Sequence, residues 1–220
     1  MTKVGFNNLP VDAEGVTFES YLPETEKEAK NLRVCRAFAE RFSQRKQEQQ
    51  EKGNGRNATG LLLFGKYGTG KTLLAYAIMN ELERQKLNAR YTTTIDLLDD
   101  ETSSYVYQRY DCLVLDDLGA FELNDREWRR LRKIIIGRIQ LGLPTVYITN
   151  LDNEELEFLL GGHLFNRFKH SAFPLIFDGR DRRDPTHGKK VTIDRRQDAY
   201  DEGCKAALAG QSLVSEQMLA

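Results

Sequence analysis

The segment that decides the fold runs from residue 61 to residue 72 and reads Leu61-Leu62-Leu63-Phe64-Gly65-Lys66-Tyr67-Gly68-Thr69-Gly70-Lys71-Thr72. An apolar strand here leads directly into a loop of the form G-x-x-x-x-G-K-T. In such a loop the glycines let the backbone curl, so that its N–H groups point at phosphate oxygens. Lys71 supplies a charge for the β- and γ-phosphates, and the Thr72 hydroxyl can bind Mg²⁺. The residues expected to bind ATP are therefore Gly65, Lys66, Tyr67, Gly68, Thr69, Gly70, Lys71 and Thr72.

The residues after this loop have helical spacing. Leu74, Ala75, Ile78, Met79 and Leu82 recur at intervals of one turn and would form one buried helix face. A helix beginning at the loop aims the positive end of its dipole at the phosphates. This strand–loop–helix order favours a phosphate site over a plain glycine-rich turn.

A second apolar run, Cys112–Leu115, ends in two carboxylates, Asp116 and Asp117. The run is typical of a fully buried strand, and ligands of parallel sheets collect at the carboxyl ends of strands. Asp116 is expected to hold Mg²⁺, and Asp117 to orient and deprotonate the attacking water. The alternative is that the two acids only start a turn.

Strands and helices alternate along the rest of the chain, which predicts a parallel sheet between helix layers, an α/β three-layer sandwich. Further strands are expected at 88–94, 143–150 and 174–177, and helices at 25–50, 124–140, 153–159 and 162–169. Thr25 with Glu28, three residues later, has the spacing of a capping box. In the segment before that helix, Val16, Phe18, Tyr21 and Leu22 are expected to pack on the edge of the domain.

The chain has 220 residues, 40% of them hydrophobic, which is enough for one substantial core. The expected organisation is an N-terminal segment and helix over 1–58, the ATPase core over 59–183 and a C-terminal helical appendage over 184–220. A formal net charge of -1 excludes a globally basic nucleic-acid binder, so any DNA contact would need a local patch. No apolar run is long enough to span a membrane and the start of the chain lacks the apolar stretch of a signal peptide, so a soluble, cytoplasmic protein is expected.

Two polar residues later in the chain are candidates for catalysis. Asn150 closes the strand that ends Ile148-Thr149-Asn150, where its amide could reach the attacking water and the γ-phosphate; Asn also commonly begins a turn. Arg167 lies near the end of a short helix, where an arginine is usually a solvated cation favoured by the helix dipole. It could instead neutralise charge on a transferring phosphoryl group.

The order of these motifs resembles one family. The phosphate loop, Leu113–Gly119, Ile148–Asn150, Leu159–Phe168 and Gly179–Arg183 follow one another as in the AAA+ ATPases of the DnaC/DnaI helicase-loader and IstB transposition-helper family, and the resemblance covers about residues 17 to 183. It implies a three-layer AAA+ P-loop core with a five-stranded parallel sheet. It also implies that Asn150 is the sensor I residue, that Arg167 is the finger reaching a neighbouring subunit's nucleotide, and that Arg183 is the sensor II arginine. Arg180 and Arg182 remain alternatives to Arg183.

The chain departs from the family in two places. Only about sixteen residues precede the segment that begins at Thr17, so the usual N-terminal partner-binding domain is expected to be missing. The DNA-contacting insertion after the second strand is reduced to Asp99–Asp111. DNA could instead meet a basic stretch on the helix at 124–140 or one at 180–196, although such runs are usually solvated helix faces. The first stretch comprises Arg126, Arg129, Arg130, Arg132, Lys133 and Arg138.

The function expected from these residues and the resemblance is a Mg²⁺-dependent ATPase of DNA replication that assembles with copies of itself and helps load a replicative helicase on single-stranded DNA. The alternatives are a transposition helper of the IstB type and a nucleotide-gated adaptor with little turnover. The complete loop, the two acids and Asn150 favour turnover.

Overall fold

The computed structural model describes residues 9–52 and 60–183, and the compact unit that contains them extends over Met1–Arg183. Its centre is a sheet of five parallel strands: β1 (Gly60–Gly65), β2 (Ala89–Thr93), β3 (Cys112–Asp116), β4 (Thr145–Thr149) and β5 (Ala172–Phe177). The strand order is β2-β3-β4-β1-β5. Leu63 of β1 lies beside Ile148 of β4 and Leu175 of β5, so the strand of the phosphate loop is central.

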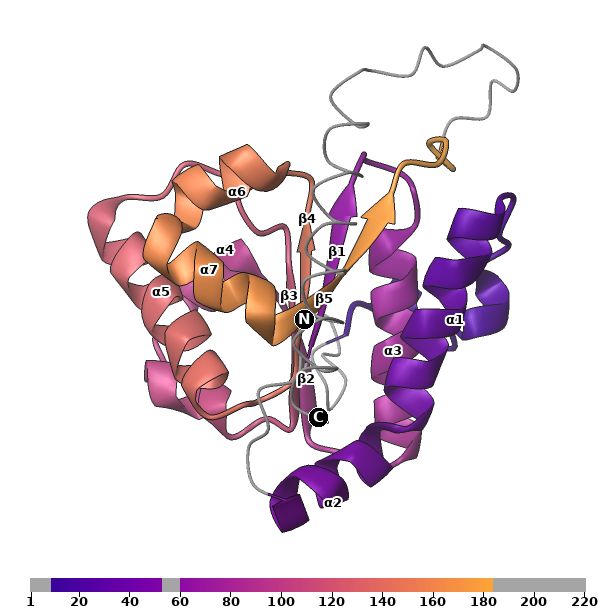
Figure 1. The fold of residues 1–220 in the computed structure, drawn as a ribbon, viewed down its shortest axis with the longest axis horizontal. Coiled ribbons are helices and arrows are strands. Elements are labelled where there is room, and N and C mark those ends of the chain that lie inside the picture. The colour runs from indigo at the N-terminus through magenta and orange to yellow at the C-terminus, as the bar shows by residue number, and fades with distance from the viewer. Residues whose placement is uncertain (1–8, 53–59, 184–220) are drawn as a thin grey trace, which may run out of the picture. The chain divides into compact units, whose positions relative to one another are not determined.

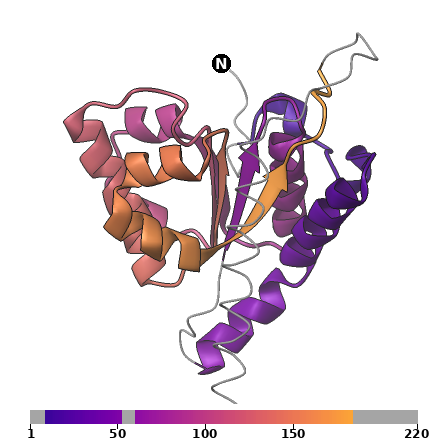
Figure 2. The ribbon, with the colours of Figure 1, turned by 45° about the horizontal axis from the view of Figure 1, so that its top comes forward.

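Helices cover both faces of this sheet, as Figures 1 and 2 show. On one face lie α1 (Glu26–Glu40) and α3 (Lys71–Arg84), and α2 (Phe42–Lys52) continues from α1 below the sheet in Figure 1. On the other face lie α4 (Thr94–Asp99), α5 (Asp125–Gln140), α6 (Asn153–Leu160) and α7 (Gly162–Ser171). Three short 3-10 helices, η1 (Val11–Ala13), η2 (Phe18–Ser20) and η3 (Ser104–Gln108), lie in the connections. The expected three-layer α/β sandwich with a five-stranded parallel sheet is confirmed.

The core follows from the apolar runs of the central strands. Every residue of β3 and β4 is buried, and Leu63, Val114 and Val146 have no exposed surface. The helix after the phosphate loop buries Leu74, Ile78 and Leu82 as its spacing predicts. Burial on both faces holds the carboxyl ends of β1, β3 and β4, and hence the polar residues that follow them, in fixed relative positions.

The single helix expected over 25–50 is wrong, because the chain breaks at Arg41 into α1 and α2. Arg41 has a ψ of 10°, outside the helical range. Side chains from elsewhere satisfy the last carbonyls of α1: the Arg45 guanidinium donates to Phe38 O, and Gln85 Nε2 donates to Ala39 O at 2.9 Å. The capping box of Thr25 and Glu28 is confirmed.

The N-terminal segment packs on the domain only in part. Phe18 and Tyr21 are buried as expected, whereas Leu22 is 72% exposed, so its expected packing is wrong. Helix α4 and the 3-10 helix η3 were not predicted. In the described part of the chain no helix is long and apolar enough to cross a membrane. The C-terminal helical appendage expected over 184–220 lies outside the described residues.

Candidate nucleotide-binding site

The phosphate loop joins β1 to α3 and encloses the Lys71 ammonium group. Lys71 Nζ donates to Gly65 O at 2.7 Å, to Lys66 O at 2.6 Å and to Asn150 Oδ1 at 2.8 Å. Burial lowers the pKa of Lys71 to about 8, although the nearby carboxylates of Asp116 and Asp117 act against this. The loop and the end of β4 therefore converge on one partly desolvated cation.

Asp116, the last residue of β3, is 2% exposed and receives three hydrogen bonds. Its Oδ2 accepts from the Tyr91 hydroxyl at 2.8 Å and from Thr72 Oγ1 at 3.1 Å, and its Oδ1 accepts from Asp117 N at 2.7 Å. Burial raises the pKa of Asp116, the hydrogen bonds oppose that rise, and the neighbouring Asp117 carboxylate adds to it. Thr72 and Asp116, the two residues expected to hold Mg²⁺, thus lie within hydrogen-bond distance of each other.

Asp117 has a left-handed backbone, with φ of 56°. Such a φ is uncommon outside glycine, and Asp is one of the residues that tolerates it. The residue that follows is held to the β4 strand, because Leu118 N donates to Ile148 O at 2.9 Å and Thr149 Oγ1 donates to Leu118 O at 2.7 Å. The strand thereby stops at Asp117, and the following loop is tied to β4.

A cavity of about 920 Å³ lies in front of this edge, and most of the predicted site residues line it. The predicted residues in its lining are Tyr67, Gly68, Thr69, Gly70, Lys71, Thr72, Asp116, Asp117, Asn150 and Arg183. Leu9, Pro10 and Val11 close one side. A polar cavity of this size, next to a phosphate loop and two acids, can hold a nucleotide.

Gly68 and Gly70 are two of the loop positions where a side chain would not fit. Gly68 has φ of 72°, and a Cβ there would lie 1.7 Å from Asp181 Oδ1. Gly70 has φ of 92°, and its Cβ would lie 2.7 Å from the Tyr21 ring. Both the strained backbone and the close neighbours require glycine. The loop is therefore clamped between the N-terminal segment and the chain after β5.

The three candidate sensor II arginines have different surroundings. Arg180 pairs with Glu24. Arg182 lies 4.3 Å from the centre of the Tyr21 ring, donates to Leu22 O at 2.8 Å and pairs with Glu28 at 3.2 Å. Its backbone N–H also donates to Gly68 O at 2.8 Å.

Arg183 is exposed, lines the cavity and lowers the pKa of Lys71 through its charge. Among the three, its guanidinium is the one whose position within the described residues leaves it available to a bound phosphate. The choice of Arg183 remains a prediction.

Arg167 is not part of this cavity. It lies exposed on α7, in the helix layer opposite α1 and α3. Its side chain is not among those that line the nucleotide cavity of its own chain. Its expected role as a finger toward a neighbouring subunit stays a prediction. His163, on the same helix, is exposed as well.

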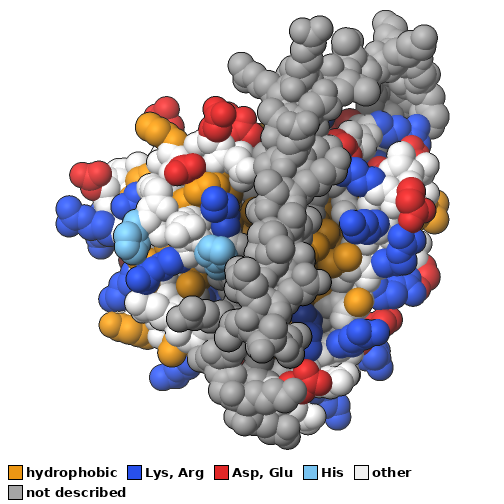
Figure 3. All heavy atoms as spheres, viewed as in Figure 1, with side chains coloured by type: hydrophobic (Ala, Val, Ile, Leu, Met, Phe, Trp, Pro, Cys, Tyr) orange, Lys and Arg blue, Asp and Glu red, His pale blue; other side chains and the backbone are white. Residues whose placement is uncertain are grey.

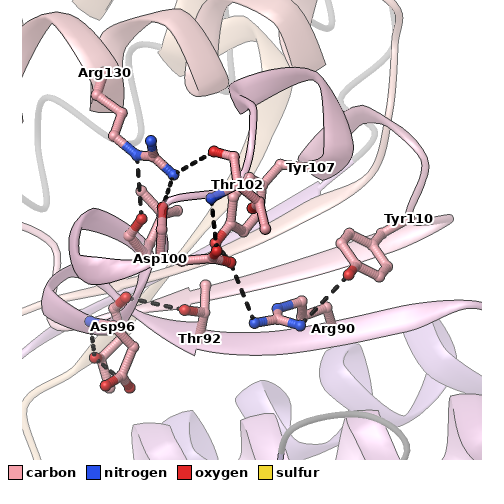
Figure 4. A network of polar contacts seen from close by, with 10 residues as sticks. Arg90, Thr92, Asp96, Asp100, Thr102, Tyr107, Tyr110 and Arg130 are labelled. Atoms are coloured by element: carbon pink, nitrogen blue, oxygen red, sulfur yellow. Dashed lines mark hydrogen bonds and ion pairs between the residues drawn. The ribbon is translucent and has the colours of Figure 1, made fainter.

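The segment between β2 and β3 is folded back on the domain, as Figure 4 shows. Asp100 accepts from Thr102 N at 2.9 Å and from the Tyr107 hydroxyl at 2.8 Å, and lies 3.6 Å from Arg90. Burial raises the pKa of Asp100, but these contacts outweigh it and the net pKa is lowered. Arg130 of α5 donates to Thr102 O at 2.8 Å.

Two residues of the basic stretch on α5 are used for contacts within the domain. Arg130 is engaged with the β2–β3 segment, and Arg138 is completely buried. Arg138 donates to Thr145 Oγ1 at 2.8 Å, to Pro144 O at 2.6 Å and to Tyr107 O at 2.5 Å. These two cations are therefore structural, and the interpretation of the whole stretch as one DNA-binding face is wrong.

Two site residues were missed from the sequence. Tyr91 of β2 donates to Asp116, and its ring meets that of Tyr76 edge-on at 5.2 Å. Tyr76 also lines the cavity. Their apolar rings fit a buried strand and helix face, so nothing local distinguishes them from core residues. Their role follows only from the pairing of β2 with β3.

Few of the described side chains are available as metal ligands here, which suits a metal ion that is bound mainly by a nucleotide. In the described ranges, no three acidic, histidine or cysteine side chains are grouped so that they could hold a metal ion by themselves. Thr72 Oγ1 and the Asp116 carboxylate lie together, as expected for Mg²⁺, which keeps few protein ligands and completes its shell with phosphate oxygens and water. Residues Thr72 and Asp116 would hold the ion.

Comparisons with known proteins agree with this geometry. A family model described as RNA helicase matches residues 61–151, from β1 to the end of β4. The replicative helicase loader DnaI of Bacillus subtilis is 28% identical over 160 residues, which cover 61% of this chain and 50% of DnaI. The replicative helicase loader DnaC of Escherichia coli strain K12 is 26% identical over 190 residues, covering 80% of this chain and 73% of DnaC.

The chain thus matches about half the length of DnaI and about three quarters of DnaC. A crystal structure of DnaI superposes with a TM-score of 0.62 and 25% identity, over 80% of this chain and 94% of that one. The sheet order, the clamped phosphate loop and the acids at the end of β3 give the chain the three-layer fold of an AAA+ P-loop protein, and these comparisons make it similar to the helicase loaders DnaI and DnaC.

Proposed function

We propose that this chain is a Mg²⁺-dependent ATPase that helps load a replicative helicase on single-stranded DNA. The observation that carries the ATPase half is the convergence of Lys71, Asn150 and the Thr72–Asp116 pair on one cavity. Packing alone does not explain a buried ammonium, a buried carboxylate and an amide meeting at the edge of a sheet. The loading half is supported by the names of the relatives, DnaI and DnaC, both replicative helicase loaders.

The position of each residue in the cavity suggests its role in ATP binding and hydrolysis. The backbone of Gly65–Thr72 would bind the phosphates. Lys71 Nζ would exchange its hydrogen bonds to the carbonyls of Gly65 and Lys66 for hydrogen bonds to phosphate oxygens. Asp117, at the mouth of the cavity, would orient the attacking water and accept its proton. Mg²⁺, when bound by Thr72 and Asp116, would neutralise charge on the phosphates.

Asn150 would relay the state of the γ-phosphate to β4. Its Oδ1 now accepts from Lys71, so a phosphate that draws Lys71 away would free the amide to orient water. Arg183 would add a second cation at the cavity. Arg167 would serve a neighbouring copy, which makes the active species an oligomer.

Loading is tested directly on circular single-stranded DNA, which a closed helicase ring cannot enter from an end. The chain, the replicative helicase of its own cell and the circle are incubated with ATP and Mg²⁺, and the helicase recovered with the DNA by gel filtration is counted. The expected result is several times more helicase on DNA with the parent protein than with Lys71→Ala. Equal recovery with and without the chain would reject the loading role.

An ATPase measurement in the same samples separates the alternatives. Loading without turnover would favour the nucleotide-gated adaptor. Turnover without loading would leave an ATPase with another partner, such as a transposase.

A further inference from the structure

A second hollow lies outside the nucleotide cavity, between the loop that follows β3 and helix α6. We call it the acidic groove, and its volume is about 690 Å³. It is lined by Gly119, Ala120, Phe121, Glu122, Leu123, Trp128, Leu151, Glu154, Glu155, Phe158 and Leu159. The groove is separate from the residues that line the nucleotide cavity.

Large apolar side chains stand open to solvent in this groove. Phe158 of α6 is 91% exposed, and Phe121 is 50% exposed. Leu156 and Leu160, on the other side of the same helix, are buried. Helix α6 therefore packs on the domain through these two residues, and Phe158 lies on its solvent-facing side. An exposed aromatic pair beside further apolar side chains is typical of an interaction site.

The charged side chains that line the groove are all acidic. Glu122, Glu154 and Glu155 line the groove, and no Lys or Arg does so among the residues described. Helix α6 adds Glu157, and Asp152 caps it. Figure 3 shows acidic and hydrophobic side chains together over α6, at the upper left. Within the described chain none of these five carboxylates has a Lys or Arg partner.

One wall of the groove already accepts a cation. The Arg132 guanidinium lies 5.3 Å from the centre of the Trp128 ring. Indole is the aromatic ring that binds cations best. A groove with such a wall and an acidic rim favours a cationic ligand and repels the phosphates of nucleic acids.

The floor of the groove is held in place before any ligand arrives. Gly119 follows the loop that Thr149 Oγ1 fixes through Leu118 O, and a Cβ on Gly119 would lie 2.3 Å from Leu151 Cδ1. Leu151 N in turn donates to Thr149 Oγ1 at 3.1 Å. A preformed groove loses little conformational entropy on binding, which favours a specific partner.

We propose that the acidic groove binds an amphipathic helix of a partner protein, one that carries large apolar side chains on one face and Lys or Arg beside them. Apolar anchors one turn apart would contact Phe121, Phe158 and Leu159, and the flanking cations would face Glu122 and Glu154. The proposal goes beyond the ATPase and does not depend on it, since no residue of the nucleotide cavity takes part.

The test uses the chain's single tryptophan, Trp128, as the reporter. The probe is a Trp-free helical peptide of about 18 residues, or five turns, with Leu on one face and Lys on the rest. A matched peptide carries Glu in place of every Lys. The expected result is a saturable change of Trp128 emission with the cationic peptide, which weakens as salt is added, and no change with the acidic one.

Variants locate the site. Phe158→Ser and Glu154→Lys are each expected to weaken the cationic peptide at least about tenfold, as expected for loss of an interface anchor or reversal of a rim charge. Both residues are exposed, so the fold is retained and is checked by circular dichroism. Matched controls are Leu141→Ser, an exposed apolar residue outside the groove, and Glu83→Lys, an exposed acid on α3; neither should change binding.

Three results would overturn the proposal. The first is the absence of saturable binding of the cationic peptide to the parent protein. The second is equal affinity for both peptides, or affinity unchanged in Phe158→Ser and Glu154→Lys. The third is self-association of the parent without peptide that Phe158→Ser abolishes, which would make a second copy of the chain the occupant.

Discussion

The Lys71 ammonium group donates a hydrogen bond of 2.8 Å to the Asn150 side-chain oxygen, so the start of α3 and the end of β4 are joined across the sheet edge. A polar link between two segments 79 residues apart, inside a cavity, makes the position of each depend on the other. A nucleotide that attracts Lys71 must break this link. The variants below test what each partner contributes.

The Lys71→Ala variant should bind ATP more weakly than the parent protein. The variant removes the charge that the phosphates would meet, and we expect affinity to fall at least about tenfold, since hydrogen bonds to charged groups contribute about 1.5–3 kcal/mol. Thermal unfolding should shift little, because burying the cation is itself unfavourable. Isothermal calorimetry and a melting curve measure both quantities. Lys169→Ala, which removes an exposed cation of α7 outside the cavity lining, is the control, and unchanged affinity in a folded Lys71→Ala would refute the site.

ATP binding should also become pH-dependent in the alkaline range. The pKa of Lys71 is lowered to about 8 in the free protein because it is buried, and phosphates would raise it again. Below about pH 8 the lysine is already charged and affinity is flat. Above it, binding must take up a proton, so affinity falls up to about tenfold per pH unit. Calorimetry in two buffers of different ionisation enthalpy counts the proton, and Lys71→Arg, which stays charged, should show neither effect.

Substitutions of Asp116 and Asp117 should have different effects on the protein. Asp117→Asn keeps a residue that tolerates a φ of 56°, so we expect a folded protein that binds ATP and turns it over at least about a hundredfold more slowly. Asp116→Asn places an amide where two hydroxyls and one N–H all donate, so it should weaken Mg²⁺ dependence and cost about 1–3 kcal/mol of stability. Steady-state ATPase assays with Mg²⁺ titration and denaturant unfolding separate the two. Parent-rate turnover by Asp117→Asn would exclude it as the base.

Arg167 should act between copies of the chain. It is exposed and does not line the cavity of its own chain, so ATPase activity per chain should rise with protein concentration, and Arg167→Ala should abolish that rise without affecting ATP binding. Mixing Arg167→Ala with Lys71→Ala should restore activity, because some interfaces then pair an intact loop with an intact arginine. Lys169→Ala, another exposed cation of α7, is the control. Concentration-independent hydrolysis by a monomer would exclude the finger.

Asp100→Asn should destabilise the fold in a pH-dependent way. Hydrogen bonds lower the pKa of Asp100 below its ordinary value of 3.8, so its stabilising effect is complete above that value and is lost as pH falls through the lowered pKa. At neutral pH the variant should be less stable by about 1–2 kcal/mol. In strong acid the two proteins should unfold alike. Urea unfolding across that range measures the difference, and a difference that persists in strong acid would contradict the assignment.

The features that were predicted correctly are local in sequence. The strand, loop and helix around Lys71 are contiguous, and so are β3 with its two acids and the capping box of Thr25 and Glu28. Periodicity and capping chemistry act over a few residues and can therefore be recognised without the fold.

The features that were missed depend on distant contacts. The break at Arg41 is stabilised by Gln85, which comes from α3, and the surroundings of Asp116 include Tyr91, which comes from β2. The different surroundings of Arg182 and Arg183 follow from the path of the N-terminal segment. The sequence near these residues does not identify their contact partners, because tertiary packing determines which distant residue reaches them.

Arg138 has a consequence for the order in which the chain folds. Its buried guanidinium is satisfied by carbonyls and a hydroxyl from two other segments, the one from η3 to Tyr110 and the one that leads into β4. An arginine cannot enter an apolar interior before such acceptors are there. The side of the domain that contains α5 is therefore expected to close only when the β2–β3 segment and the start of β4 have reached their places.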